Sequence, residues 1–191
     1  MPRLFVSIDL PERIKARLST LRTGALAARW VEPEKLHLTL RFVGDVDEGV
    51  AQEIDAALRR VDAPRFSLTL KGIGHFRRHT LWVGIENCPP LMSLQAKVED
   101  AIRRAGLLGE AGRYVPHVKL ARLRWRGGSQ LRSLPNDCVL FCAEPFEVEQ
   151  FSLIESRLSR TGATYEHRAD YALRPIRQSV GEAAAGPQRS L

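Results

Sequence analysis

Apolar and polar residues alternate in several short segments of the chain, which is the pattern of a β-strand with one buried face. The strands predicted in this way cover residues 4–10, 36–43, 66–70, 81–85, 117–123 and 146–152, with a short one at 171–173. Other segments repeat apolar residues at helical spacing, which predicts helices over 12–24, 49–61 and 91–105. Residues 30–34 are expected to form a connector, and the glycine-rich residues 72–76 a turn. The pattern therefore predicts a chain that contains both strands and helices.

The order of these elements repeats once along the chain. In each half a strand is followed by proline, a helix and a second strand that carries a histidine. The first strands begin at Leu4 and Leu81, 77 residues apart (81 − 4), and the histidines are His37 and His117, 80 apart (117 − 37). Strand–helix–strand units are common, so coincidence is an alternative, but histidines at matched positions favour a duplicated unit. Duplication predicts a single bilobal domain over residues 1–176. Its two pseudo-symmetric lobes are expected to form a central cleft where their equivalent strands meet, and a flexible tail is expected at 177–191.

Each histidine strand places a second polar residue on the same face as its histidine. His37 shares its face with Thr39, and His117 shares its face with Lys119, while leucine or valine fills the opposite face. Taken alone, each histidine is more often an ordinary strand residue, Thr39 a good strand former and Lys119 part of a solvated face. The matched pair favours function, because two imidazoles on opposite sides of a phosphate can serve as general base and general acid. The hydroxyl and the ammonium would then hold phosphate oxygens.

Composition and charge narrow the class of protein. The 29 Lys and Arg residues exceed the 22 Asp and Glu residues and give a net charge of +7, which suits an anionic partner such as nucleic acid. An arginine-rich composition without such a partner explains the charge equally well. No apolar run is long enough for a membrane span, and the N-terminus lacks a signal-peptide pattern. Cys88, Cys138 and Cys142 form no CxxC pair and are expected to be reduced thiols. Cys138 and Cys142 could be metal ligands, but no His or Cys residues cluster around them, so they are expected to pack in the core. We therefore expect a cytoplasmic monomer with no metal ion, cofactor or membrane contact.

Six segments in the same order resemble one known family. Leu36-His-Leu-Thr-Leu and Pro116-His-Val-Lys-Leu resemble the paired motifs of the two-histidine (HxTx) phosphoesterase superfamily. Within it the chain is similar to the RNA 2′,3′-cyclic phosphodiesterases, also called 2′-5′ RNA ligases. The resemblance runs from residue 3 to about residue 175 and rests on residues 3–11, 36–44, 72–76, 81–84, 116–122 and 151–156. It implies a bilobal α+β fold with antiparallel sheets that face the central cleft, with helices outside and with the two motifs facing each other.

The resemblance also implies roles for individual residues. His37 and Thr39 match the first motif, His117 matches the second, and the family suggests His117 as general base and His37 as general acid. Lys119 stands where the family usually has Thr or Ser. Its ammonium is expected to bind phosphate more strongly and to lower the pKa of a neighbouring imidazole, which suits His117 as the base.

Other residues are weaker candidates for substrate binding. Phe5 resembles the family's base-stacking aromatic residue, although a phenylalanine in a strand is more often part of the core. Arg122 could reach a phosphate, although a solvated arginine is at least as common. His75 is assigned to a structural turn, and His79 and His167 to the surface without partners.

Two functions follow from these assignments. The leading hypothesis is hydrolysis of an RNA-terminal 2′,3′-cyclic phosphate to a 2′-phosphomonoester, with RNA ends or nucleoside 2′,3′-cyclic phosphates as substrates. The same geometry run backwards would join a 5′-hydroxyl to the cyclic phosphate. The alternative is a non-catalytic module that binds RNA ends, in which Lys119 has turned a catalytic site into a phosphate clamp. The intact histidine pair argues against that alternative.

Overall fold

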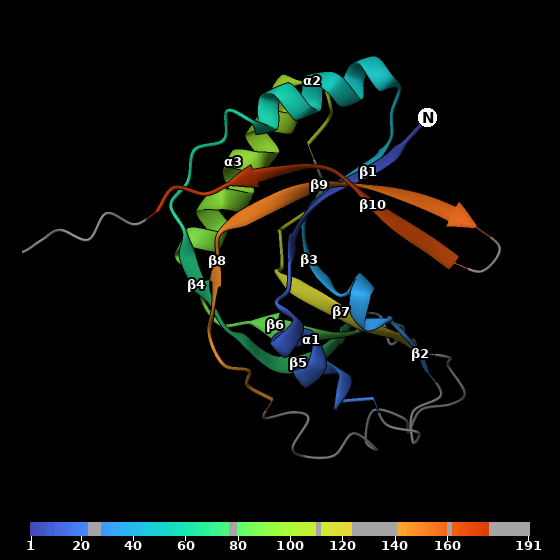
Figure 1. Ribbon diagram of the computed structural model, residues 1–191, viewed down its shortest axis with the longest axis vertical. Helices are drawn as coiled ribbons and strands as arrows, with labels where there is room; N and C mark the ends of the chain where they lie inside the picture. The colour runs from blue at the N-terminus through green and yellow to red at the C-terminus, as the bar shows by residue number, and fades with distance from the viewer. Residues whose placement is uncertain (23–27, 77–79, 110–111, 124–140, 160–161, 176–191) are drawn as a thin grey trace, which may run out of the picture.

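The computed structural model describes residues 1–22, 28–76, 80–109, 112–123, 141–159 and 162–175 of the 191-residue chain. These residues form strands and helices in mixed order (Figure 1). The helices are α1 (Glu12–Ser19), η1 (Pro33–Lys35, a 3₁₀-helix), α2 (Glu48–Leu58) and α3 (Pro89–Arg104). The strands are β1 (Arg3–Asp9), β2 (Ala28–Trp30), β3 (His37–Asp45), β4 (Phe66–Leu68), β5 (Leu70–Phe76), β6 (Thr80–Ile85), β7 (His117–Leu123), β8 (Phe146–Val148), β9 (Gln150–Ser159) and β10 (Gly162–Ala172).

Most of the described strands belong to one antiparallel sheet in the order β10-β9-β1-β3-β7-β6-β5, with β2 beside β7. The two halves of this sheet meet where β3 pairs with β7, and Leu38 opposite Val118 is the pairing that joins them. Both side chains are fully buried. A short second sheet consists of β4 and β8. The predicted α+β class with antiparallel sheets is confirmed, and the two histidine strands are adjacent at the centre of the molecule.

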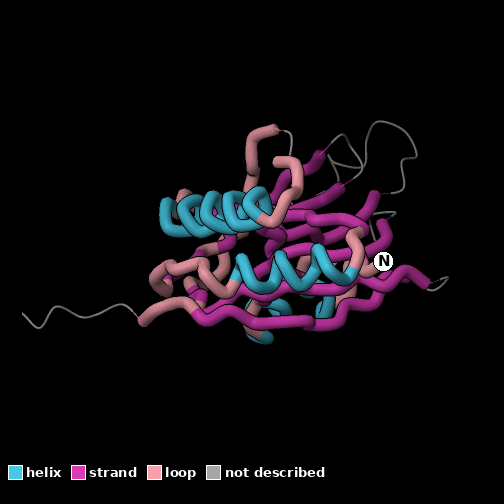
Figure 2. Tube along the Cα trace, turned by 90° about the horizontal axis from the view of Figure 1, so that it is seen from above, coloured by secondary structure: helices cyan, strands magenta, loops and turns pink. Residues whose placement is uncertain are grey.

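The helices cover the sheet from different sides. Helix α3 contacts α2 and also β3, the histidine strand of the first half, and its inward residues Leu91, Leu94, Val98 and Ile102 are fully buried. In Figure 2 the two longer helices run along the strands. Helix α1 instead lies near β5, because its Arg17 stacks 5.6 Å from the ring of Phe141, whose carbonyl accepts a hydrogen bond from Gly72. Each half of the sheet is therefore covered by a helix that follows a strand of the other half.

Each histidine strand contains one extra residue at the same place. Opposite β1, the pairing skips Leu40 of β3, and opposite β6, it skips Leu120 of β7. Such a β-bulge resets the alternation of side chains, so the residue after each of these leucines is buried as well. As a consequence, Phe42 and Arg122 return to the exposed face that carries the histidines.

The matching bulges support the duplication and correct its alignment. Val6 pairs with Arg41 before the bulge in the first half, and Leu81 pairs with Ala121 before the bulge in the second. Val6 is therefore the counterpart of Leu81, an offset of 75 residues (81 − 6). The sequence comparison had matched Leu4 with Leu81 instead.

Several predicted boundaries are wrong for identifiable reasons. The predicted turn at 72–76 is part of β5, since Gly74 lies opposite Trp82 and an added Cβ there would be 2.2 Å from the indole ring. The helix predicted over 12–24 ends at Ser19, after which i→i−3 bonds tighten the chain. The predicted connector at 30–34 contains the end of β2 and the start of η1, and the short strand predicted at 171–173 is the end of the longer β10.

The predicted strands 66–70 and 146–152 are each divided in the structure. The breaks fall at residues 69 and 149, where the chain passes from the small sheet to the large one. Within the described residues, no helix has the length and apolar character needed to cross a membrane.

The cysteines differ in burial. Cys88 is half-buried and packs against the core, whereas Cys142, which was expected in the core, is exposed, so that prediction is wrong. Cys138 and the predicted tail at 177–191 lie outside the described residues.

Candidate active site

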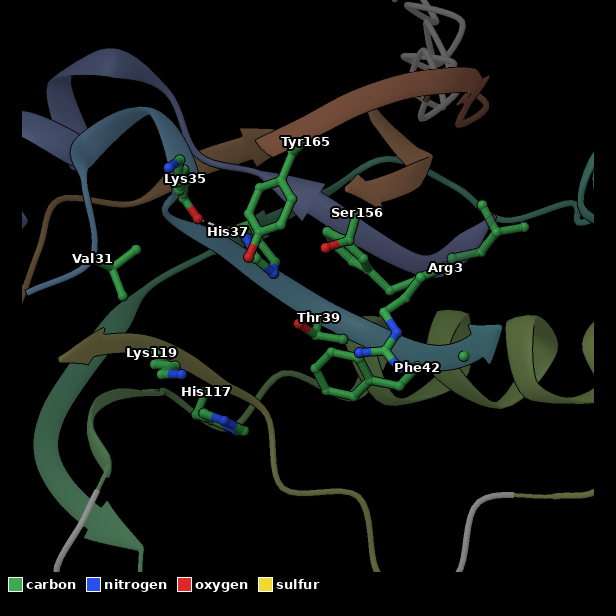
Figure 3. Close-up of a pocket in the computed structure, with 13 residues that line it drawn as sticks. Arg3, Val31, Lys35, His37, Thr39, Phe42, His117, Lys119, Ser156 and Tyr165 are labelled. Carbon is green, nitrogen blue, oxygen red and sulfur yellow. Dashed lines mark hydrogen bonds between the residues drawn. The ribbon is translucent and has the colours of Figure 1, made fainter. Parts of the chain in front are cut away.

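The two histidines line one cleft of about 420 Å³ at the junction of the two half-sheets. His37 begins β3 and His117 begins β7, so the seam between these strands sets their separation. Thr39 and Lys119 line the same cleft (Figure 3). The four residues singled out from the paired motifs thus converge on a single site, as the sequence predicted.

Both imidazoles are oriented by the same backbone hydrogen bond. Nδ1 of His37 lies 2.8 Å from the carbonyl oxygen of Lys35, and Nδ1 of His117 lies 2.9 Å from that of Val115. A carbonyl can only accept, so each Nδ1 carries the proton and donates. In the neutral ring Nε2 is then the basic nitrogen, and in the charged ring it is a donor. Both rings therefore present a nitrogen to the cleft that can either take or give a proton.

Aromatic side chains fix the planes of both imidazoles. The centroid of the His37 ring lies 4.9 Å from that of Phe5 and 5.4 Å from that of Tyr165. The His117 ring meets Phe76 at 4.8 Å and Trp82 at 6.2 Å. Since each ring is held by a hydrogen bond and by two aromatic neighbours, little reorientation is needed before proton transfer.

The charges around the two histidines differ. The pKa of His37 is lowered from its ordinary value, mainly by burial. The hydrogen bond to the carbonyl of Lys35 and the carboxylate of Asp9 raise this pKa and so reduce the shift. Lys119 and His117 lower the same pKa further through their charge. The charge of Lys119 thus acts across the cleft on the pKa of His37. The expectation that Lys119 lowers the pKa of His117 stays a prediction.

The residue opposite each histidine accounts for part of this difference. Asp9 is the cross-strand partner of His37, and Gly84 is the partner of His117. Directly opposite residues point to the same face, so a carboxylate accompanies only the first histidine. Asp9 also lies 3.4 Å from Nε2 of His167, whose Nδ1 is 3.2 Å from Asp170. His167, expected to lack partners, is therefore paired with two carboxylates.

The weaker candidates for substrate binding, Phe5 and Arg122, differ in their position relative to the cleft. Phe5 lines the cleft but is only 4% exposed, so its ring supports His37 and offers little surface to a base. Arg122 does not line the histidine cleft but a neighbouring pocket. Among the aromatic rings that line the cleft, Phe42, 56% exposed, and Tyr165, 37% exposed, are open to solvent. Sequence reasoning missed Phe42 because simple alternation places it on the buried face, and the bulge turns it outward.

The backbone that carries Thr39 is held by a further contact. The hydroxyl of Tyr114 donates a hydrogen bond of 2.9 Å to the carbonyl oxygen of Thr39. Tyr114 belongs to the segment that leads to His117, so this bond ties the two histidine segments together. Across the described ranges, no group of three or more His, Cys, Asp and Glu side chains is placed to hold a metal ion.

Comparisons with known proteins agree with this geometry. A model of the 2′-5′ RNA ligase superfamily matches residues 10–160. An RNA 2′,3′-cyclic phosphodiesterase of Thermotoga maritima is 33% identical over 174 residues, which cover 86% of this chain and 91% of that protein. A crystal structure from Thermus thermophilus has a TM-score of 0.78 at 26% identity and covers 91% of this chain and 98% of that one. The crystal structure of E. coli LigT complexed with 3′-AMP has a TM-score of 0.75, also at 26% identity, with coverage of 91% and 99%. Because the family model matches most of its length, the chain belongs to the 2′-5′ RNA ligase superfamily.

Proposed function

We propose that this protein hydrolyses the terminal 2′,3′-cyclic phosphate of RNA to a 2′-phosphomonoester. The observation that carries the proposal is the pair of imidazoles on equivalent strands, each with Nδ1 held by the carbonyl two residues earlier and Nε2 left for the shared cleft. The name of the Thermotoga maritima relative, an RNA 2′,3′-cyclic phosphodiesterase, supports the same substrate. The complex of the similar E. coli protein with 3′-AMP supports a nucleotide in the cleft.

The reaction needs one proton to be removed and one to be supplied. One neutral imidazole accepts a proton from water as the water oxygen bonds to phosphorus. The bond from phosphorus to the 3′ oxygen breaks, and the other imidazole, protonated, gives its proton to that oxygen. The products are a 2′-phosphate and a 3′-hydroxyl, and the two histidines have exchanged protonation states. With a 5′-hydroxyl in place of water as the nucleophile, the same steps form a 2′-5′ linkage and release the 3′-hydroxyl.

We assign His117 as the base and His37 as the acid, in agreement with the family resemblance. The asymmetry between Asp9 and Gly84 supports this assignment, because a carboxylate favours the protonated form of the imidazole opposite it. Burial lowers the pKa of His37 in the empty cleft and works against a protonated acid. A bound phosphate is anionic, and it raises the pKa of any imidazole that it contacts. In this mechanism substrate binding therefore charges His37.

Thr39 and Lys119 are assigned to the non-bridging oxygens of the phosphate. Both line the cleft, one from each histidine strand. A hydroxyl donates a neutral hydrogen bond, whereas an ammonium donates a charge-assisted bond of roughly twice the strength. Charge that accumulates on these oxygens in the transition state is then stabilised mainly from the Lys119 side.

The proposal is tested by incubating the protein with a nucleoside 2′,3′-cyclic phosphate in EDTA and following the product by ³¹P NMR. We expect the 2′-monoester to form. Binding of the nucleotide without any turnover would instead favour the alternative, a non-catalytic module that holds RNA ends through Lys119. The expectations of a monomeric, cytoplasmic protein and of residues 1–176 as one folded unit stay predictions. Size-exclusion chromatography tests the first and limited proteolysis the last.

A further inference from the structure

A second pocket, also of about 420 Å³, continues the histidine cleft at one end. The two share Lys35, Lys119 and Tyr165 in their linings, so a ligand can extend from one into the other. In Figure 3 Lys35 and Lys119 lie at one end of the cleft, and Phe42 lies toward the other. We call this second pocket the basic pocket, because it is lined by Arg29, Lys35, Lys119 and Arg122.

Two arginines face each other in the basic pocket. Arg29 of β2 is the direct cross-strand partner of Arg122 of β7. Like charges placed directly opposite each other in a sheet repel each other and are destabilising. The bulge at Leu120 is what brings Arg122 to the face of Lys119, since strict alternation would have turned it away. The strand geometry thus gathers positive charge at this end of the cleft.

The lining of the basic pocket offers little negative charge to Lys35, Lys119 and Arg122. Its one carboxylate among the described residues, Glu32, is already 3.6 Å from the guanidinium of Arg22. Lys35, Lys119 and Arg122 form no ion pair with any described residue. Exposed cations without partners are the usual contacts of nucleic-acid phosphates.

The other end of the cleft has a different character. A pocket of about 480 Å³ there shares Thr39, Phe42 and His117 with the cleft, and it is lined by the exposed rings of Phe42 and Phe76. The lining of this pocket includes two arginines, Arg103 and Arg113, and one carboxylate, Glu99. The exposed rings of this pocket can stack on the flat face of a base. The basic pocket, with four cations and one carboxylate that is already paired, is better suited to bind a phosphate.

We propose that the basic pocket binds the phosphodiester that precedes the terminal cyclic phosphate. The protein would then recognise the end of an RNA chain and not only a terminal nucleoside, with the chain leaving the cleft across the face of the paired strands β2 and β7. This inference rests on the proposed function, because it takes the cyclic phosphate to lie between the two histidines.

The test compares the binding of two products, a nucleoside 2′-phosphate and the dinucleotide that carries one additional 5′ phosphodiester. The wild-type protein should bind the dinucleotide about tenfold more tightly, the range expected for one charge-assisted contact. Its log–log salt dependence should be steeper by about 0.7, the value for one phosphate of a single strand. Arg122→Gln should remove most of this difference, and Arg122→Lys, which retains the charge, should keep the steeper salt dependence.

Two further arginine variants serve as controls. Arg60→Gln removes the same charge from an exposed site just beyond α2, and it should leave the preference for the dinucleotide unchanged. Arg113→Gln removes a charge from the opposite pocket and should also leave the preference intact. Equal affinity of the wild type for both products overturns the inference, and so does loss of the preference in Arg113→Gln but not in Arg122→Gln. Cleavage of a nucleoside cyclic phosphate is measured on the same wild-type preparation, and its absence would refute the proposed function instead.

Discussion

Replacing either catalytic candidate, His37 or His117, with glutamine removes proton transfer while keeping a polar group near the position of Nε2. The glutamine amide can still donate a hydrogen bond to a phosphate, but it neither accepts nor releases a proton near neutral pH. Loss of a positioned acid or base typically lowers the rate about 10²–10⁴-fold. This range corresponds to about 2.7–5.4 kcal/mol of transition-state stabilisation. We expect each single variant to lie within it, measured as turnover of a nucleoside 2′,3′-cyclic phosphate.

The structural cost of the change is smaller than the catalytic one. His37→Gln loses the 2.8 Å bond from Nδ1 to the carbonyl of Lys35, a contact worth about 0.5–1.5 kcal/mol of folding free energy. His37→Asn is a matched control, because the shorter amide can reach that carbonyl but leaves the position of Nε2 empty. Both variants should lose turnover, and the glutamine variant should keep more affinity for the 2′-phosphate product. The double variant His37→Gln, His117→Gln should lose less than the product of the single losses, since the two residues act as a unit.

The stability of the His37 variant also has a predictable pH dependence. The folded protein holds the pKa of His37 below its ordinary value, mainly through burial. The unfolded chain therefore binds more protons than the folded one once the pH falls below about 6.5, and the wild type loses stability there. His37→Gln should lose less stability than the wild type over the same fall in pH, measured by chemical denaturation.

If either glutamine variant kept near-normal turnover, the assignment of that histidine as a catalytic residue would be refuted.

Four other changes have defined outcomes. Lys119→Thr should weaken binding of the 2′-phosphate product. It should also raise the pKa of His37, which moves the basic limb of the pH–rate profile to higher pH. A shift of the acidic limb instead would mean that His37 is the base and His117 the acid. Asp9→Asn should move the same basic limb to lower pH, and an unchanged profile would show that the carboxylate does not tune His37. Leu38→Ala, at the fully buried seam, should cost about 2–5 kcal/mol and lower Tm by about 4–20 °C in calorimetry; a loss below 1 kcal/mol would mean that the seam tolerates a cavity. Turnover should survive EDTA, and rescue by a divalent ion after a loss would contradict the metal-free mechanism.

The sequence predicted most of the elements, and the four residues that line the cleft, because these depend on local patterns. Alternation identifies a strand such as β3 whichever strands flank it, and two histidines at matched places in a repeat imply a shared site. The superfamily membership suggested by the motifs is confirmed. The residues that sequence reasoning missed depend on pairing between distant strands. The outward position of Phe42 follows from a bulge opposite β1, which no periodicity within β3 reveals.

The other errors have a related origin. β10 has mostly exposed side chains, so it lacks the alternation that marks a half-buried strand, and its pairing with β9 holds it in place. Gly74 has the appearance of a turn residue in the sequence, but its missing side chain makes room for Trp82, which packs beside His117. In both cases the structure depends on pairing with a neighbouring strand, β9 or β6, which the pattern within a single segment does not reveal.

The two halves of the site share what proton transfer requires and differ in what gives the reaction a direction. Both contribute an imidazole held by the same hydrogen bond to the carbonyl two residues earlier, which a duplicated strand supplies automatically. Three pairs of equivalent positions around the histidines then carry different residues: Thr39 corresponds to Lys119, Asp9 to Gly84, and Phe42 to Arg122. With identical residues at these positions, either histidine could serve as base and the RNA could enter from either end. In the proposed mechanism the first two differences set the direction of proton transfer. The third sets the direction of the chain, since a ring that can stack on a base faces one end of the cleft and a cation faces the other.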